Sequence, residues 1–435
     1  MMRSRYTDGP ALNVDRVWWL SPGRLLVFFI LPIYLFMTLV VPEIWPHLLV
    51  VRASSYMRGQ FLALGAACVV VLAFGCLVGS RVDLTSRPSK LYEVNDRFLL
   101  GMGLLVVAAY LIWFWPIIRQ GSLLMHRQEL NHMPGVTSFT QFGVPFVVCY
   151  LYGALRSGQR FSQPVRVLFY AILFLTVARV YIWSERLALI EVGVPALTCV
   201  LAYYTPRQPF LSKSFKIVGA YGPFLGMPLL VAFFMGTEVV RSWSAETYQA
   251  QNLDFGEFMV SRLATYYYTA LNSGAGLLAT ADWPDYSFSH TLSWFYRLPF
   301  GIGEIFWSAT GQGESPTQLF LNRFGDPEFS NMSGIFPIVY DLGFVGGLLY
   351  FAVLGLVTGM MYRGMRRERP LGILLYPPMF VACLEVLRIP YLTQPRCFLI
   401  FLGGLVAVTQ FRPKRADSAA ASGSLAEFGS SPVRS

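Results

Sequence analysis

Charged residues are scarce in this sequence: they make up 13% of its 435 residues, while 55% of the residues are hydrophobic. A soluble domain carries about 25% charged residues, so the composition argues against a soluble protein. The chain also lacks a Walker A loop, a GxGxxG turn after a strand, and a GxSxG elbow. These motifs mark nucleotide-binding loops and one class of hydrolases. Any reaction must therefore use a substrate that is already activated.

Cysteine and histidine are also few. The six cysteines lie in or beside apolar runs without a CxxC pair, and we interpret them as small buried hydrophobic residues. The four histidines (His47, His126, His132 and His290) fall in predicted outer loops without metal-ligand spacing, so we expect no metal site. The net charge is +10, but no basic and aromatic module stands apart from the apolar runs, which argues against nucleic-acid binding.

Long apolar runs are what the chain has in abundance. The hydrocarbon core of a bilayer is about 30 Å thick, and crossing it takes about 20 helical residues. We predict ten membrane-spanning helices, of which the fourth and sixth are short. They cover residues 25–42, 60–80, 98–118, 139–155, 165–183, 186–203, 215–236, 335–362, 371–388 and 395–411. The first run follows a polar stretch and is long enough to be an anchor, so we expect no cleaved signal peptide.

The basic residues predict how the helices are oriented. Of the 34 Lys and Arg residues, 22 fall in short segments on the side of the N-terminus, which the positive-inside rule makes cytoplasmic. Both termini are then cytoplasmic, as an even number of spans requires. The twelve basic residues left over are all arginine. Arginine offers a rigid fork of donors for phosphate and carboxylate, although a chain with only four lysines gives such a bias easily.

The remaining organisation is simple. Residues 1–415 form a single transmembrane domain, which includes one large outer loop at 237–334. This loop is rich in Trp, Tyr and Phe, a composition that suits an ordered structure on the membrane surface with amphipathic helices. The tail at 416–435 is small and polar, and we predict that it is disordered and cytoplasmic. No internal repeat is visible.

Ionisable residues at the ends of spans are candidates for a functional site, because they are costly in a membrane. The predicted topology puts eight of them near the outer face, where one polar site can collect them: Arg179, Glu185, Arg186, Glu191, Asp341, Glu385, Arg388 and Arg396. The alternative is a set of structural ion pairs. In that case Arg186 pairs with Glu185 or Glu191, and Arg388 pairs with Glu385 on one helix face.

The outer loop contains a helical pattern at residues 256–278. Its polar residues recur every three or four positions and form one stripe: Arg262, Thr265, Thr269, Asn272 and Gly276. The stripe either faces water on an interfacial helix or turns toward a sugar or phosphate. We favour the functional interpretation for Arg262, and the aromatic belt for the tyrosines at 266–268.

Three segments resemble the bacterial O-antigen polymerases, the Wzy-type oligosaccharide repeat-unit polymerases. Residues 333–364 resemble the family's C-terminal hallmark, with Leu342 where an aromatic residue is usual. The matching positions are Tyr340, Asp341, Gly343, Gly346, Gly355, Gly359, Tyr362 and Arg363. Two shorter segments, SERLALIEVGV and RLATYYYTALNSG, are similar to a Ser-x-Arg element (Ser184, Arg186) and to Arg, Tyr and Asn elements (Arg262, Tyr266, Asn272).

The resemblance implies a GT-C-like membrane glycosyltransferase in the bacterial inner membrane, multi-pass, that needs no cofactor. Repeat units on undecaprenyl diphosphate are joined on the periplasmic face into O-antigen or another exopolysaccharide. A chain-length regulator protein is a partner by family analogy. Two alternatives stay open: an O-antigen ligase-like glycosyltransferase, and a non-enzymatic flippase or exporter of lipid-linked oligosaccharides. Transporters are usually built from paired repeats, which this sequence does not show.

The chemistry of such a transfer assigns roles to the charged residues. The leaving diphosphate builds up negative charge that arginine stabilises. The candidates that bind substrate are Arg186, Arg262 and Arg388, then Arg297 and Arg323, with Arg179 and Asn272. A base that takes the proton of the acceptor hydroxyl contributes about 10²–10⁴-fold. The candidates for this base are Asp341, Glu385 and His290.

Overall fold

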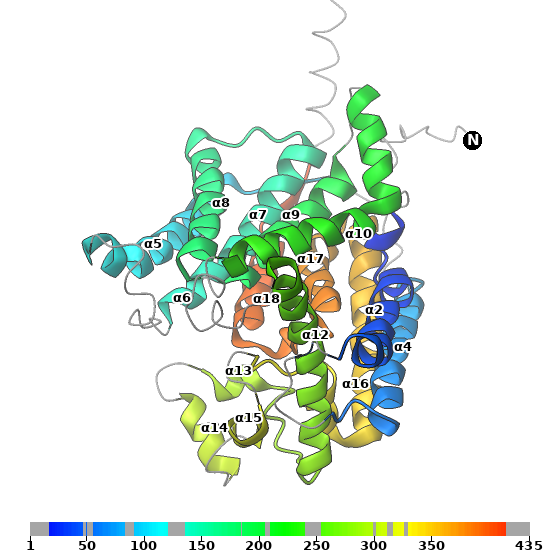
Figure 1. Ribbon diagram of the computed structural model, residues 1–435. Coiled ribbons are helices and arrows are strands. Elements are labelled where there is room, and N and C mark those ends of the chain that lie inside the picture. The colour runs from blue at the N-terminus through cyan, green and yellow to red at the C-terminus, as the bar shows by residue number, and fades with distance from the viewer. Residues whose placement is uncertain are drawn as a thin grey trace, which may run out of the picture.

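The computed structural model is almost entirely helical (Figure 1). It describes residues 17–46, 49, 55–82, 91–120, 135–183, 185–204, 209–239, 254–298, 302–310, 316–325 and 329–414. The predicted disordered tail at 416–435 lies outside these residues.

Ten helical segments follow the ten predicted spans. The first five are α1 to α3 (Pro22–Ile44, with π-helical turns at Leu26–Ile30 and Phe36–Val40), α4 (Gln60–Gly79), α5 (Asp96–Gln120), α6 to α7 (Val136–Ser157, with a 3₁₀ and a π turn) and α8 (Gln163–Trp183). The other five are α9 (Arg186–Tyr203), α10 (Pro209–Glu238), α16 (Phe336–Arg366), α17 (Pro370–Glu385) and α18 (Pro395–Val408). The apolar runs therefore located every one of these helices within a few residues.

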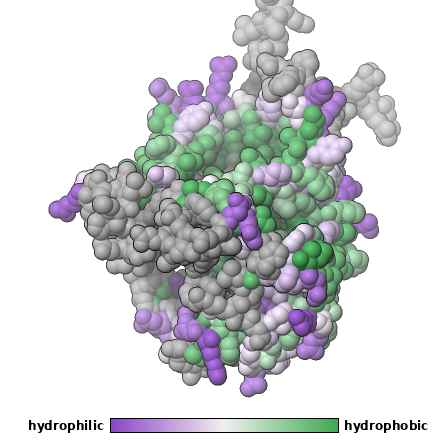
Figure 2. All heavy atoms as spheres, in the orientation of Figure 1, coloured by the Kyte–Doolittle hydropathy of each residue, from purple (hydrophilic) through white to green (hydrophobic). Residues whose placement is uncertain are grey.

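Eight of the segments are long and apolar enough to cross a bilayer. The two short ones are α17 and α18, with 16 and 14 residues. The sequence predicted instead that the fourth and sixth spans are the short ones. A helix of 14 residues rises only about 21 Å. On the face shown in Figure 2, hydrophobic side chains form a broad area in the upper half, and many hydrophilic ones lie along the edges. The protein is an all-α membrane protein.

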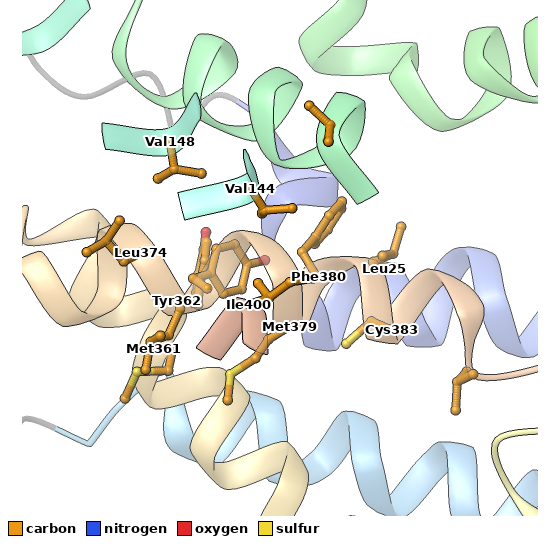
Figure 3. Close-up of a cluster of buried hydrophobic side chains, with 14 of the residues drawn as sticks. Leu25, Val144, Val148, Met361, Tyr362, Leu374, Met379, Phe380, Cys383 and Ile400 are labelled. Atoms are coloured by element: carbon orange, nitrogen blue, oxygen red, sulfur yellow. The ribbon is translucent and has the colours of Figure 1, made fainter. Parts of the chain in front are cut away.

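Helix α17 lies at the centre of the hydrophobic core. Its side chains meet residues from α1, α7, α16 and α18, so neighbours surround the helix on all sides. The labelled members are Leu25, Val144, Val148, Met361, Tyr362, Leu374, Met379, Phe380, Cys383 and Ile400 (Figure 3). All six cysteines are buried and unpaired, which confirms the prediction from their apolar surroundings.

The most extensive contact between two helices joins α4 and α16. Glycines face one another across it, with Gly75 and Gly79 on α4 and Gly355 and Gly359 on α16. A Cβ atom added to Gly75 would lie 2.5 Å from the carbonyl oxygen of Ala352, so no larger side chain fits. Small residues let the two backbones touch, which is a common way to pack helices in membranes.

A small sheet ties the end of the last helix to an early loop. Strand β1 (Tyr92–Val94) pairs antiparallel with β2 (Phe411–Pro413). The side chain of Gln159 bonds both the amide and the carbonyl of Val94, at 2.9 and 2.7 Å. The Nζ atom of Lys414 donates to the carbonyl of Ser157 at 2.8 Å. These contacts fix the end of the bundle that we predict to be cytoplasmic.

The described part of the predicted outer loop includes α12 (Phe255–Thr280), α13 (Ser293–Tyr296), α14 (Ile302–Thr310) and α15 (Pro316–Phe324). Helices α13 to α15 gather in the lower left of Figure 1, below α17 and α18 and level with the lower parts of α12 and α16. The carboxylate of Asp254 caps α12 by accepting from the amide of Gly256 at 2.9 Å. Helix α12 is buried over most of its length, and Arg262, Thr265, Thr269 and Asn272 are among its buried residues. The interpretation in which its polar stripe faces water is therefore wrong.

Candidate functional site: a buried arginine cluster beside a polar cavity

Three of the predicted arginines converge from separate helices. Arg186 is the first residue of α9, Arg262 lies two turns into α12, and Arg388 follows the end of α17. They meet two carboxylates and one tyrosine, and we call this set the arginine cluster: Arg186, Glu238, Arg262, Tyr266, Glu385 and Arg388. Within this set of described residues, three guanidinium groups face two carboxylates.

Glu238, the last residue of α10, links two of the arginines. Its carboxylate pairs with Arg186 through one oxygen and accepts from Nε of Arg262 through the other, at 3.1 Å. The Glu238 side chain is only 2% exposed. Sequence reasoning missed this residue because the predicted seventh span ended at 236. A lone acidic residue at the end of an apolar run was the signal that pointed to it.

Arg388 makes the second half of the cluster. Its Nε donates to the Glu385 carboxylate, and its terminal nitrogen NH1 donates to the Tyr266 hydroxyl. The other terminal nitrogen, NH2, is buried and has no hydrogen-bond partner among the described residues. A buried donor without a partner is costly in free energy, so a ligand oxygen that reached this nitrogen would be bound favourably.

Aromatic rings hold the arginines in place. The Arg186 guanidinium lies 4.1 Å from the ring centre of Phe234, and that of Arg262 lies 4.6 Å from the ring centre of Phe329. The ring of Tyr266 contacts both phenylalanines, with ring centres 5.8 and 6.4 Å apart. Cation–π attraction is strengthened where water is excluded. The geometry of the cluster is therefore set by side chains that are themselves packed.

The predicted local ion pairs hold in one case and fail in the other. Glu385 pairs with Arg388, three residues away, as the spacing indicated. Arg186 does not pair with Glu185 or Glu191, because α10 brings Glu238 to it. Glu185 binds Arg179 instead, with 2.6 Å between Oε2 and Nε, and Glu191 binds Arg396, with 3.5 Å between Oε1 and NH1. Arg179 thus belongs to a second group of charges, between α8, α9 and α18.

A polar cavity of about 780 Å³ opens between α13, α14, α15 and the chain that follows α17. Its wall carries hydroxyl and amide side chains, two large aromatic rings and one predicted arginine. The members are Ser289, Ser293, Thr317, Gln318, Asn322, Ser330, Asn331 and Gln394, then Tyr296 and Trp307, and Arg297. Ile389 and Pro390 also line the cavity, and Arg388 directly precedes them. The volume lies within the range of about 300–1,000 Å³ that is typical of ligand sites.

His290 lies in the wall of this cavity. Its Nε2 atom is 2.9 Å from the hydroxyl oxygen of Thr317. Burial, together with the nearby charge of Arg297, lowers the pKa of His290 from 6.5 to about 4. The imidazole is therefore neutral at neutral pH and can accept a hydrogen bond.

Asp341 lies behind the histidine and is fully buried. Its Oδ2 atom accepts three hydrogen bonds: from the amide of His290 at 2.9 Å, and from the amide and hydroxyl of Thr291 at 2.6 and 2.8 Å. Two residues further on, α16 kinks at Gly343, whose φ of +74° suits glycine. Pro284 packs against this kink. A Cβ atom added to Gly343 would lie 3.3 Å from the Cγ atom of Pro284. Asp341 therefore holds the histidine loop onto the second turn of α16.

The two remaining predicted residues lie elsewhere. The Asn272 carbonyl accepts from the amides of Tyr56 and Met57, at 2.7 and 3.3 Å, and so fixes the chain before α4. Arg323 is exposed near the end of α15, where its guanidinium lies 5.2 Å from the ring centre of Phe324. Neither residue lines the polar cavity.

The fold and the site together define a polytopic helical membrane protein with a buried arginine cluster beside a polar cavity. Comparisons of the chain with protein-family models, with curated proteins and with solved structures give no match.

Proposed function

We propose that this protein is a membrane glycosyltransferase that polymerises oligosaccharide repeat units carried on undecaprenyl diphosphate, at the outer face of a bacterial inner membrane. One observation carries the proposal. Three arginines that are far apart in the sequence converge beside a cavity lined by hydroxyl, amide and aromatic groups. A diphosphate needs the first feature and an oligosaccharide needs the second.

The arginine cluster suits a leaving diphosphate. When an acceptor hydroxyl attacks the anomeric carbon, the bond from that carbon to the diphosphate oxygen breaks and its electron pair stays on the diphosphate. Arg388 has a buried nitrogen without a hydrogen-bond partner among the described residues, which such an oxygen would satisfy. Arg186 and Arg262 stack on Phe234 and Phe329, the two rings that flank Tyr266. Fixed donors at a site of developing charge each contribute about 10²–10³-fold.

His290 suits the proton of the acceptor hydroxyl. Its neutral ring lines the cavity, whereas Glu385 is bound to Arg388 and Asp341 is enclosed. We therefore propose His290 as the base and Asp341 as a positioning residue that holds its loop. Tyr296 and Trp307 offer ring faces to the sugars, and no step needs a nucleotide or a metal.

The position of the cavity supports an enzyme over a transporter. Transporters usually hold their substrate near the bilayer midplane, between paired repeats. Here the cavity lies among α13, α14 and α15, at one end of the long spans.

Deletion of the gene in its source organism, followed by gel analysis of surface glycans, tests the proposal. We expect long polymer to vanish while a single repeat unit still reaches its final acceptor. Full-length polymer that accumulates on undecaprenyl diphosphate would instead mean a ligase. Single lipid-linked repeats trapped on the cytoplasmic leaflet would mean a flippase.

Complementation of the deletion assigns the residues. We expect Arg388→Ala to abolish polymer at a normal membrane level, and Arg388→Lys to restore little of it, because lysine lacks the fork. Arg323→Ala is the matched control, since Arg323 is exposed and lies outside the cavity wall. Unchanged polymer in Arg388→Ala would remove this arginine from the mechanism.

A further inference from the structure

Helix α16 carries an apolar groove on its exposed side. The residues that line it recur at spacings of three and four along one face: Leu342, Gly346, Leu349, Tyr350, Val353, Leu354 and Val357. The groove has a volume of about 450 Å³. From Leu342 to Val357 it follows the helix for about 22 Å. That is longer than half of the hydrocarbon core of a bilayer, which is about 15 Å.

The groove adjoins a small chamber inside the bundle. The chamber lies between α16, α17 and residues 386–393, and it shares Tyr350 and Leu354 with the groove. It shares Ile389 and Pro390 with the polar cavity. Three spaces that share wall residues thus follow one another from the lipid-facing side of α16 to the hydroxyl-lined cavity. The groove is apolar and the cavity is polar. This order suits an amphiphile whose long apolar tail lies in the groove and whose sugar head lies in the cavity.

The chamber also contains an unused polar group. Tyr391 lines it and is 2% exposed, and its hydroxyl has no hydrogen-bond partner among the described residues. A buried hydroxyl without a partner is unfavourable.

We propose that the groove on α16 binds the polyprenyl chain of the substrate, and that Tyr350 and Leu354 form a lateral gate through which the head group reaches the polar cavity. The choice of this tail rests on the proposed function. The groove follows a single helix face, so it fits one linear chain better than the paired acyl chains of a phospholipid. The chamber measures only about 30 Å³, so Tyr350 and Leu354 must turn aside for a head group to pass.

Photocrosslinking of the purified full-length protein in lipid nanodiscs tests the tail site. The probe is undecaprenyl phosphate with a diazirine at the far end of its chain, and the labelled peptide is mapped by mass spectrometry. We expect label on residues 342–357, removed by unlabelled undecaprenyl phosphate but not by phosphatidylglycerol. Equal competition by phosphatidylglycerol would mean that the groove holds bulk lipid, and label spread over all exposed helices would mean no site.

Two valine substitutions on α16 make a matched pair. Val353 lies in the groove and is 59% exposed, whereas Val345 lies outside it and is 66% exposed. We expect Val353→Trp to reduce labelling about tenfold, because the added ring occupies the apolar surface, and Val345→Trp to leave labelling unchanged. Equal labelling of the two variants would overturn the proposal.

The gate is tested in the same membranes. We expect Tyr350→Ala to leave tail labelling intact and to raise the labelling of cavity residues by a probe that carries the diazirine on its head group. If the tail site holds while deletion of the gene leaves polymer unchanged, the tail site stands and the polymerase proposal falls. If the polymer is lost but the groove takes no label, only the tail site falls.

Discussion

Helices α4 and α16 meet through glycine, whereas helices α9, α10 and α12 meet through buried charges. Both contacts join segments that lie far apart in the chain. At the first, backbone touches backbone along Gly75, Gly79, Gly355 and Gly359. At the second, Glu238 holds Arg186 and Arg262 among aromatic rings. The first contact brings two helices together in a membrane without desolvating any charge. The second requires several charged groups to be desolvated.

This difference distinguishes a contact that stabilises the fold from a contact that forms the candidate site. Close packing of small residues gains dispersion energy without desolvating a charge. A buried ion pair gives up the hydration of both partners, and apolar residues of similar size are often as stable or more stable in its place. The arginine cluster is therefore weak evidence for stability. Its presence between helices that could have packed with apolar residues supports a role in binding an anion.

The largest effect is expected where the shared carboxylate is removed. Glu238→Ala leaves Arg186 and Arg262 buried without their common partner, and breaking a buried pair in this way costs about 3–5 kcal/mol. We expect a clear drop in the thermal midpoint of the protein in detergent, followed by tryptophan fluorescence. Added pyrophosphate should restore part of it if the cluster binds that anion.

Glu43→Ala is the control for this substitution, because Glu43 is exposed in the last turn of α3. A thermal midpoint in Glu238→Ala as high as that in the control would mean that the charges are solvated and that the contrast with the glycine contact is wrong.

A second prediction concerns acid. The pKa of His290 is about 4 in the folded protein and about 6.5 in an unfolded chain. Between these values the unfolded chain binds a proton that the folded protein does not, so the free energy of unfolding falls as the pH falls from about 7 to 4. The full loss is up to about 3 kcal/mol, and the glycine contact contributes nothing to it.

The measurement compares the wild type with His290→Gln, which keeps a polar side chain at this position and does not titrate. Thermal midpoints are recorded at steps of pH between 7 and 4. We expect the gap between the two proteins to narrow or reverse as the pH falls, since only the wild type loses this contribution. Parallel curves would show that His290 titrates normally.

The third prediction concerns the glycine contact between α4 and α16. In Gly359→Ala the new Cβ would overlap the carbonyl oxygen of Cys76, and overpacking of this kind costs about 1–3 kcal/mol. Gly101 in α5 has nothing within 4 Å of the same position, so Gly101→Ala should leave the midpoint unchanged or raise it slightly. Equal midpoints for the two variants would mean that α4 and α16 separate easily, and that the scaffold is looser than its backbone contact indicates.

Sequence predicted the scaffold far better than the site, for a physical reason. An apolar run long enough for a helix is a local property, so all ten helices were found, and the spacing of three between Glu385 and Arg388 identified that pair. The link from Glu238 to Arg262 spans 24 residues and the link to Arg186 spans 52. No periodicity encodes such partners, because they depend on how α9, α10 and α12 pack.

The interpretation in which the polar stripe of α12 faces water was wrong for the same reason. Periodicity located the stripe correctly, but it could not say whether water or protein lies opposite. In the structure Glu238 meets Arg262, and the amides of Tyr56 and Met57 meet Asn272. A stripe of polar residues therefore predicts that polar groups lie opposite it. Only the tertiary structure shows whether those groups are water or protein.

The smallest effect is expected at the one predicted arginine in the cavity wall. Arg297 is exposed, so Arg297→Gln should change the free energy of unfolding by no more than about 0.5 kcal/mol. If the cavity receives a lipid-linked anion, this variant should raise the KM for the lipid-linked donor several-fold at low salt, in an assay with purified enzyme and substrate.

Salt distinguishes this arginine from the buried cluster. The screening length is about 10 Å at 0.1 M salt and about 3 Å at 1 M, so the defect of Arg297→Gln should shrink as salt is added. The defect of Arg388→Gln should persist, because its partners Glu385 and Tyr266 are in direct contact with it and water is excluded. If both defects respond equally to salt, the cluster is open to solvent during the reaction, and the two groups of arginines act on the substrate in the same way.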